Sequence, residues 1–146
     1  MDLPSPAAGI GAPALAFSAT TDVPPGLRVR VYDAFAEGDR LRTFDVVLAN
    51  PPYSIKKWNR EAWQSDQWDR NFLGTPPQGR ADYAFWQHII KSMKAKSGRC
   101  AILFPHGVLF RNEELAMREK LVAHDVVECV LGLGPNLFYN SPMEAC

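Results

Sequence analysis

The stretch that most constrains the fold is an apolar run that ends in two adjacent prolines. Residues 44–49 read FDVVLA and residues 50–53 read NPPY. A nearly continuous apolar run of this length is typical of a strand buried on both faces. Because each proline lacks an N–H and fixes φ at about −65°, the strand cannot continue past Asn50. We therefore expect a buried strand over 44–49 with a rigid exit.

Further apolar and amphipathic segments alternate along the chain. Apolar residues recur at helical spacing in two of them, and acidic residues stand near the start of each. A polar stretch rich in Trp, Gly and Pro over 54–80 is expected to form a long loop, which in a compact domain is usually functional or mobile. This order predicts an α/β fold with a mainly parallel sheet and helices on its faces. The expected strands cover 27–32, 44–49, 100–104 and 126–133, and the expected helices 82–95 and 112–124.

The pattern also predicts where side chains should gather. Ligands of parallel α/β sheets sit beyond the carboxyl ends of strands, where Asp33, Asn50 and the PHG sequence of 105–107 all stand. In the second helix, Asn112 is expected as the N-cap residue. The apolar face of the first helix should comprise Tyr83, Trp86, Ile89, Ile90 and Met93.

Composition excludes several classes of protein. In 146 residues, 47% hydrophobic and 22% charged residues indicate a single soluble globular domain. Lys plus Arg and Asp plus Glu are balanced at 16 each, so any contact with nucleic acid must be local or assisted by another chain. The longest apolar stretches are far too short for a membrane span. Three cysteines without CxxC spacing predict a reduced cytoplasmic protein with no metal site.

The NPPY motif favours a site that methylates a planar amine. The lone pair of an exocyclic amine is delocalised into its ring, and two acceptors aimed at its hydrogens free that pair. The side-chain oxygen of Asn50 is one acceptor and the carbonyl of Pro51 the second, while Pro52 adds no competing N–H. Tyr53 can stack on the ring, a contact worth about 1–3 kcal/mol. The alternative is that NPPY only forms a turn after a strand.

Four ordered segments carry a resemblance to a known family. FDVVLANPPYS, ADYAFWQHIIKSM, ILFPHGVLFR and LGLGPNLFYN together resemble the modification subunit of type I restriction-modification systems. That family consists of adenine-N6 DNA methyltransferases that use S-adenosylmethionine on a Rossmann-like sheet. The resemblance runs from about residue 28 to the C-terminus. It implies double-stranded DNA as substrate, with the adenine flipped out of the stack, and specificity and restriction subunits as partners.

The resemblance also assigns roles to residues outside NPPY. Asp33 matches an acidic position beside the cofactor or target adenine, or it is a turn residue. Asp82, Tyr83 and Phe85 match the segment that lines the cofactor pocket, although both aromatic side chains could equally belong to the core. Phe138 matches an aromatic position that stacks near the flipped base, or it packs within a loop.

Other polar residues near these motifs have simpler interpretations. Lys56, Lys57 and Arg60 follow the motif and could contact phosphates, although a short basic run in a loop is more often solvated. His106 is expected to be a hydrogen-bonded structural residue, and we assign it no chemistry.

The chain departs from the family in two places. Family members carry, upstream of NPPY, a strand and an Asp-Pro-x-x-Gly-x-Gly loop that holds the cofactor, and residues 1–49 contain no such loop. At the other end, MEAC over 143–146 stands where the family continues into another strand. We therefore expect a flexible, non-family segment over 1–27 and a partial methyltransferase domain over 28–146.

Two other functions stay open at this point. Enzymes that methylate a glutamine side chain or an RNA base also use Asn-Pro-Pro-Tyr, so the planar amine need not belong to DNA. A third interpretation is an inactive remnant that only associates with restriction-system subunits. Binding of S-adenosylmethionine distinguishes the two enzymes from the remnant, and substrate preference distinguishes the enzymes from each other.

Overall fold

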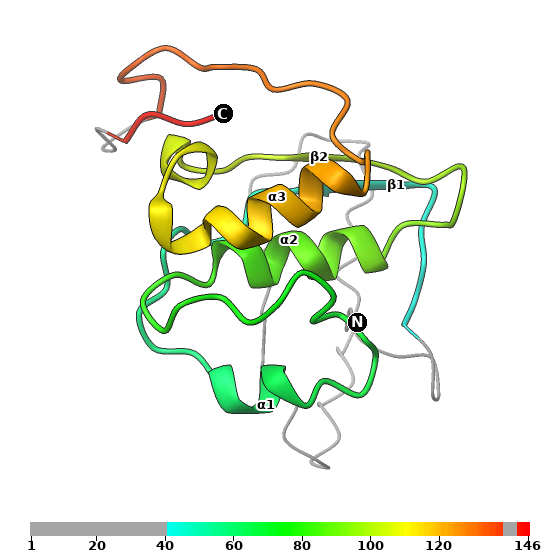
Figure 1. The fold of residues 1–146 in the computed structure, drawn as a ribbon. Coiled ribbons are helices and arrows are strands. Elements are labelled where there is room, and N and C mark those ends of the chain that lie inside the picture. The colour runs from blue at the N-terminus through cyan, green and yellow to red at the C-terminus, as the bar shows by residue number, and fades with distance from the viewer. Residues whose placement is uncertain (1–40, 139–142) are drawn as a thin grey trace, which may run out of the picture.

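The computed structural model describes residues 41–138 and 143–146. Asp33, the expected strand over 27–32 and the N-terminal segment over 1–27 lie outside these residues. The described helices and strands follow one another in an α/β order (Figure 1). They are β1 (Val46–Ala49), α1 (Arg60–Gln64), α2 (Asp82–Lys91), β2 (Arg99–Ile102), the 3-10 turns η1 (His106–Leu109) and η2 (Asn112–Glu114), and α3 (Leu115–Ala123).

The two strands form a parallel pair, as the sequence predicted. Val46 lies opposite Arg99 and Ala49 opposite Ile102. The ladder continues past β2, because the Leu103 N–H donates to the Ala49 carbonyl at 2.9 Å. Parallel strands need a long crossover, and here α1, the loop around it and α2 supply that connection. The carboxyl end of β1 therefore delivers Asn50 at the edge of the sheet.

Helix α2 ends earlier than the expected boundary at residue 95. Its last residue is Lys91, and Ser92 then accepts a hydrogen bond from the Phe44 N–H at 2.9 Å. The Lys94 N–H donates in turn to the Phe44 carbonyl at 2.9 Å, so Phe44 and Met93 form a parallel bridge. Pairing with the chain that leads into β1 replaces the last expected helical turn.

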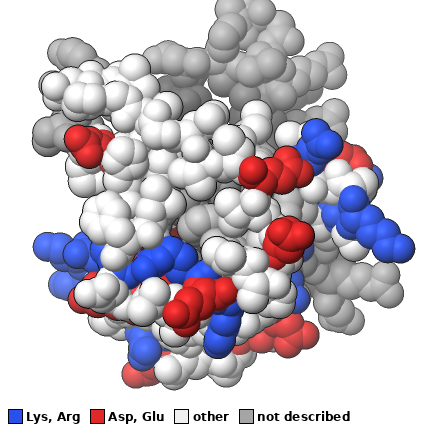
Figure 2. Space-filling model, turned by 45° about the horizontal axis from the view of Figure 1, so that its top comes forward, with Lys and Arg blue, Asp and Glu red and all other residues white. Residues whose placement is uncertain are grey.

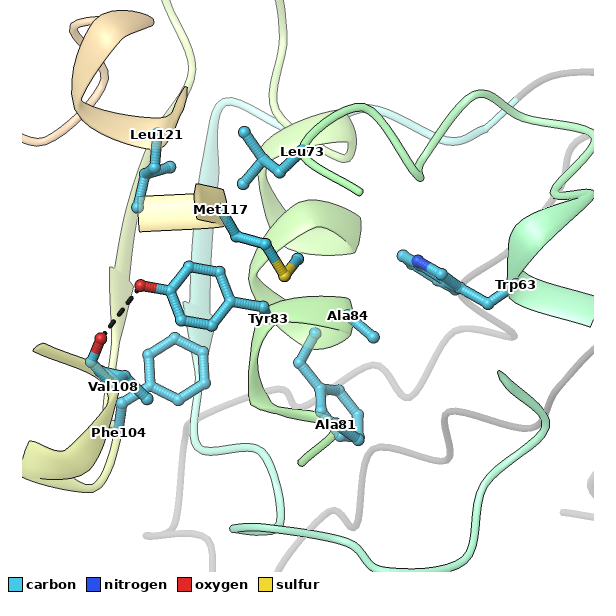
Figure 3. Close-up of a cluster of buried hydrophobic side chains, with 10 residues drawn as sticks. Trp63, Leu73, Ala81, Tyr83, Ala84, Phe104, Val108, Met117 and Leu121 are labelled. Atoms are coloured by element: carbon cyan, nitrogen blue, oxygen red, sulfur yellow. Dashed lines mark hydrogen bonds between the residues drawn. The ribbon is translucent and has the colours of Figure 1, made fainter. Parts of the chain in front are cut away.

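The core lies where α2 meets η1 and α3. Tyr83, Ala84 and Phe85 of α2 are buried, and Figure 3 shows Tyr83 beside Phe104 and Val108. From α3, two apolar side chains one turn apart reach the same cluster, Met117 and Leu121. The predicted apolar face is confirmed within α2, where Tyr83 and Ile89 are buried and Trp86 and Ile90 half-buried. Met93 is half-buried too, but it lies beyond the helix, in the bridge to Phe44.

Asn112 is not the N-cap residue that we expected. Residues Asn112–Glu114 form a 3-10 turn, and α3 begins at Leu115 without a side-chain cap. Asn112 itself is exposed, whereas Glu114 is completely buried. The tighter turn carries the Glu114 side chain inward, and the helix starts only after it.

The prediction of a strand over 126–133 is wrong. These residues have no regular secondary structure, and the segment from 126 to 131 is exposed. A strand needs a neighbour for its backbone groups. Leu133 finds one, because its N–H donates to the Ala145 carbonyl at 2.9 Å. Within residues 41–138 and 143–146, the rest of this segment has no such ladder.

The expectation that 44–49 is buried on both faces is also wrong. Exposure alternates along β1, with Val46 62% and Leu48 78% exposed. Strand β2 alternates in the same way, so its predicted burial is only partial. The half-buried face of the pair carries Val47, Ala49, Cys100 and Ile102. The other face of the pair exposes Val46, Leu48 and Ala101, with Arg99 opposite Val46.

The connection over 54–80 contains more structure than the long loop that we expected. Helix α1 buries Trp63, and Asn59 caps it by accepting from the Ala62 N–H at 3.2 Å. Arg70 is fully buried, with its guanidinium 4.9 Å from the Trp63 ring and 4.8 Å from the Trp68 ring. It also forms an ion pair with Asp66. A buried cation between two aromatic rings gives this connection its own small core.

Helix α2 holds the connection from the other side. The Gln87 side chain accepts from the Leu73 N–H at 2.7 Å and donates to the Gly74 carbonyl at 3.0 Å. Gln87 is fully buried, so these bonds replace the backbone partners that a loop lacks. None of the helices among the described residues is long and apolar enough to cross a membrane.

Candidate active site

The NPPY motif sits at the carboxyl end of β1, where the sequence predicted a ligand site. Asn50 follows the last residue of β1 and its side chain is exposed. Pro51 is buried, Pro52 exposed and Tyr53 half-buried. No described residue forms a hydrogen bond with the Asn50 side chain, so its carboxamide oxygen is available to a ligand. Pro51 thus packs into the protein, whereas Asn50 and Pro52 face solvent.

Asp82 ties the motif to the start of α2. Its Oδ1 accepts from the Ser54 backbone N–H at 2.7 Å, and its Oδ2 lies 3.4 Å from the Ser54 hydroxyl. Ser54 follows Tyr53 directly and has a positive φ of 48°, which few L-residues adopt unaided. Asp82 is 1% exposed. The carboxylate therefore holds the turn by which the chain leaves the motif.

A buried charge network continues from Asp82. Arg111 donates from its NH2 group to Asp82 Oδ2 at 2.7 Å, and its Nε lies 3.1 Å from Glu114 Oε2. The second pair is close enough for an ion pair, but its orientation does not satisfy a hydrogen bond. Burial raises the pKa of Glu114 to about 7, an effect that Arg111 opposes and Asp82 reinforces. Arg111 thus joins two carboxyl groups beneath the motif.

Tyr53 has the character of a stacking residue. Burial raises the pKa of its hydroxyl, and Cys146 and Asp82 add to the effect. The side chain therefore stays an uncharged phenol near neutral pH, and the residue is only half-buried. An uncharged and partly accessible ring suits contact with a flat aromatic ligand.

Tyr83 and Phe85 lie in the core. Tyr83 is fully buried, and its hydroxyl donates to the Val108 carbonyl at 3.0 Å (Figure 3). Burial raises its pKa to about 12. The Trp86 ring lies 5.2 Å from the rings of both Tyr83 and Phe104. Tyr83 and Phe85 therefore belong to the core, whereas Asp82 hydrogen-bonds to Ser54, the residue that directly follows the motif.

No hydrogen bond among the described residues joins the other candidate residues to the motif. Phe138 is half-buried, and nothing in the described part of the chain joins it to Asn50 or Tyr53. Lys56 and Lys57 are exposed, whereas Arg60 donates from Nε to the Pro76 carbonyl at 2.9 Å. His106 Nδ1 lies 3.2 Å from Glu144 Oε2, and this contact confirms the hydrogen-bonded histidine that we expected.

A hollow of about 750 Å³ lies next to the motif. Asn50, Cys146, all of β2 and most of segment 126–133 line it. Most of these lining residues are apolar. The hollow therefore belongs to the sheet more than to the polar site around Asp82.

Comparison with known proteins gives the family. Residues 25–146 match the model of the N-6 DNA methylase family. The chain belongs to the N-6 DNA methylase family. The resemblance inferred from its four motifs is thereby confirmed.

Relatives within the family are subunits of type I restriction enzymes. The HindI methylase subunit of Haemophilus influenzae is 32% identical over 78% of this chain and 26% of its own length. The MpnII methylase subunit of Mycoplasma pneumoniae is 35% identical over 65% of this chain and 18% of its own length. The chain thus spans about a quarter or less of these N-6 DNA methylase relatives.

A solved structure of the same kind has a similar fold. The methyltransferase subunit of a type I restriction-modification system from Streptococcus thermophilus superposes with a TM-score of 0.64 at 35% identity. The match covers 75% of this chain and 23% of that one. The parallel pair with its helices is thus part of a methyltransferase fold.

Sequence reasoning missed three residues that hold the site together in this N-6 DNA methylase chain. Ser54, Arg111 and Glu114 all belong to the network around Asp82. Arg111 and Glu114 carry a signal, since an arginine three residues before a glutamate can pair with it in a helical turn. Ser54 carries no such sequence signal, because it binds Asp82 through its backbone N–H.

Proposed function

We propose that this chain carries the target-amine half of an S-adenosylmethionine-dependent DNA adenine-N6 methyltransferase, within a modification subunit of a type I restriction-modification system. The observation that carries the proposal is the free Asn50 carboxamide, held at the carboxyl end of β1 beside a loop that Asp82 anchors. The names of the relatives favour DNA over a glutamine side chain or an RNA base.

The chemistry proposed for the chain is positioning. Asn50 Oδ1 and the Pro51 carbonyl accept the two hydrogens of the adenine 6-amino group, which turns its lone pair outward. Tyr53 stacks on the base and holds it flat. The bonds from Asp82 keep the loop after Tyr53 in place, so the acceptors do not drift when the base arrives. S-adenosylmethionine supplies the methyl group when bound.

Three buried residues are assigned to the wall of the cofactor pocket. Asp82, Tyr83 and Phe85 are buried, and both Asp82 oxygens already have partners, so these side chains do not fit direct contact with a cofactor. We propose that they form the back of a Rossmann-like cofactor pocket. Asp33 is proposed to act beside the cofactor or the target adenine, and Phe138 near the flipped base.

The proposed setting follows from the same chemistry. The substrate is double-stranded DNA with one adenine flipped out, because the 6-amino group is unreachable inside the stack. Specificity and restriction subunits of the same system are the proposed partners, and the cytoplasm is the proposed location. Equal numbers of acidic and basic residues suit a subunit that leaves most phosphate contacts to others.

Replacing the matching segment of the Haemophilus influenzae methylase subunit with residues 25–146 tests this proposal. Together with the specificity subunit of that system, the chimera should transfer tritiated methyl groups from S-adenosylmethionine to an adenine-containing duplex. Transfer to a glutamine peptide or to RNA instead would support the rival substrates. A folded chimera that binds cofactor but methylates none of the three would indicate an inactive remnant.

A further inference from the structure

Arg111 connects the motif loop to the chain that follows β2. Its NH2 group donates to Asp82 Oδ2 at 2.7 Å, and Asp82 Oδ1 accepts from the Ser54 backbone N–H at 2.7 Å. The side chains of Arg111 and Asp82 are 14% and 1% exposed, so little water competes for these bonds. Because Ser54 directly follows NPPY, the position of the guanidinium bears on the geometry of the motif.

A glycine leaves the room that the Arg111 side chain occupies. A Cβ atom at Gly107 would lie 2.7 Å from Arg111 Nε and 3.1 Å from its Cζ, closer than packed atoms come. A larger residue at this position would therefore push the guanidinium aside. The Arg111 backbone N–H also donates to the Gly107 carbonyl at 3.0 Å, which fixes the base of the side chain. The glycine of the PHG sequence thus forms the seat of Arg111.

Glu114 lies on another edge of the same guanidinium. Its side chain is fully buried, and its Oε2 lies 3.1 Å from Arg111 Nε without satisfying a hydrogen bond. Neither carboxyl oxygen of Glu114 has a hydrogen-bond partner among the described residues. A buried carboxyl group in this state destabilises the fold, so its place requires an explanation other than stability. Its attraction for Nε turns the fork of Arg111 so that the NH2 group faces Asp82.

We propose that Arg111 is a positioning residue for methyl transfer and acts through Asp82. Gly107 and Glu114 hold its guanidinium in place. The guanidinium fixes the Asp82 carboxylate, which fixes the turn after NPPY, so the two acceptors of the motif stay aimed at the amine. The inference rests on the proposed function, in which NPPY supplies those acceptors. A displacement of about 1 Å at a reacting group can lower a rate about 100-fold, so a residue outside the motif can matter this much.

Surface arginines differ from Arg111 in this respect. Figure 2 shows acidic and basic side chains side by side on the surface, where water screens their charges. Arg80 is an example: its side chain is 39% exposed, and its Nε lies 3.8 Å from an oxygen of Glu113, which is 63% exposed. Exposed pairs of this kind hold a fixed geometry poorly. Arg80 therefore provides the control for Arg111.

Amide exchange in the full chain, followed by NMR, tests the anchoring without an activity assay. Gly107→Ala displaces the guanidinium but keeps every charge, and the φ of Gly107 is not positive, so alanine fits its backbone. Arg111→Lys keeps the charge but removes the fork. Each should raise the exchange rate of the Ser54 amide about tenfold or more relative to that of Lys94, whose N–H pairs with the Phe44 carbonyl.

Two matched variants serve as controls for the exchange measurement. Gly79→Ala adds a methyl group where no atom lies within 4 Å of the new carbon. Arg80→Lys makes the same replacement as Arg111→Lys at an exposed arginine. Neither should change the ratio of the Ser54 and Lys94 exchange rates.

Methyl transfer by the chimera with its specificity subunit tests the catalytic role. Gly107→Ala and Arg111→Lys should lower kcat about tenfold or more, with KM for DNA and cofactor affinity changed by less than about twofold. Glu114→Gln should lower kcat by about threefold without lowering Tm at about pH 8, since it removes a buried carboxylate that lacks hydrogen bonds. A slower enzyme of undiminished stability cannot be explained by poor folding.

A double-mutant cycle tests whether Arg111 acts through Asp82. Asp82→Asn weakens the shared carboxylate, so adding Arg111→Lys to it should lower kcat by no more than about a further twofold. Fully multiplied losses would mean that Arg111 acts by another route, and would overturn the proposal.

Two further results would overturn it. One is unchanged Ser54 exchange in both Gly107→Ala and Arg111→Lys. The other is normal kcat for both variants in a chimera whose unsubstituted form is active. A chimera that binds cofactor but methylates nothing would instead refute the proposed function, and with it the catalytic role of Arg111. The exchange rates would then still decide whether Arg111 anchors the turn.

Discussion

Asp82 accepts a 2.7 Å hydrogen bond from the backbone N–H of Ser54, the residue that directly follows NPPY. The bond joins the catalytic motif of the proposed enzyme to the first residue of α2. Arg111 binds the same carboxylate at 2.7 Å, so the motif, α2 and the chain after η1 meet at one buried group. The geometry of the motif thus depends on a residue outside it.

Replacing Asp82 should therefore destabilise the fold strongly. Asp82→Ala leaves the Ser54 N–H and the Arg111 guanidinium without a carboxylate, and we expect a loss of about 3 kcal/mol or more in the free energy of unfolding. Asp82→Asn should cost less, because one acceptor oxygen remains. Urea unfolding followed by circular dichroism measures both changes.

A surface ion pair provides the control for Asp82. Asp45 binds Lys94 at 2.9 Å, but both side chains are largely exposed. Asp45→Ala should change the free energy of unfolding by less than about 1 kcal/mol. Similar small losses for Asp45→Ala and Asp82→Ala would contradict the anchoring role of Asp82.

Two buried titratable groups predict an unusual dependence of stability on pH. Glu114 has its pKa raised from 4.5 to about 7, so between these values the folded protein holds a proton that the unfolded chain releases. Its contribution to the free energy of unfolding therefore falls as pH rises. Burial, reinforced by Arg70 and opposed by Asp66, lowers the pKa of His88 from 6.5 to about 4. Its contribution rises with pH in that window, because there only the unfolded chain is protonated.

The two contributions should cancel where the windows overlap, between pH 4.5 and 6.5. Each has a slope of about 1.4 kcal/mol per pH unit. In Glu114→Gln only the slope of His88 remains, and stability should rise with pH across the window. In His88→Gln it should fall. Chemical unfolding at several pH values measures the slopes, and parallel curves for the two variants would refute the pKa assignments.

The buried hydroxyl of Tyr83 should contribute a measurable hydrogen bond. Tyr83→Phe removes the donor to the Val108 carbonyl at 3.0 Å and should cost about 1 kcal/mol in the free energy of unfolding. Tyr53→Phe is the matched control, because no described residue pairs with the Tyr53 hydroxyl. Its effect should stay below about 0.5 kcal/mol. Thermal unfolding of the two variants side by side compares them.

Asn50 should be required for methyl transfer and dispensable for folding. In the chimera with the Haemophilus influenzae subunit, Asn50→Ala removes one of the two acceptors and should lower transfer by about 100-fold or more. Cofactor affinity should change little, as calorimetry can show. Asn112→Ala, at another exposed asparagine, should leave transfer intact. Equal loss of transfer and cofactor binding in Asn50→Ala would make Asn50 a structural turn residue.

Local sequence patterns predicted the parts of this fold that depend on near neighbours. The apolar face of α2 follows from helical spacing, and the exit at Asn50 follows from the two prolines. The end of α2 could not be predicted, because it depends on Phe44, a residue 49 positions before Met93 that pairs beside it. Helix boundaries set by such distant pairing leave no mark in the helix itself.

The exposure of β1 and the network around Asp82 could not be predicted for a similar reason. Exposure alternates along β1, but its sequence is apolar at nearly every position. The sequence therefore predicts that Val46 and Leu48 are buried, although both are exposed. Asp82 was assigned to the cofactor pocket because its segment matches the one that lines this pocket in the family. Its partner Ser54 donates from the backbone, which any residue except proline could do.

The contacts of Asp82 also bear on the order in which the protein folds. Its bonds reach 28 residues back to Ser54 and 29 residues forward to Arg111. Closing both of these loops costs chain entropy, so we expect these contacts to form late. The motif loop therefore becomes ordered only after α2 and η1 have met, and it should be among the first parts to loosen when they separate.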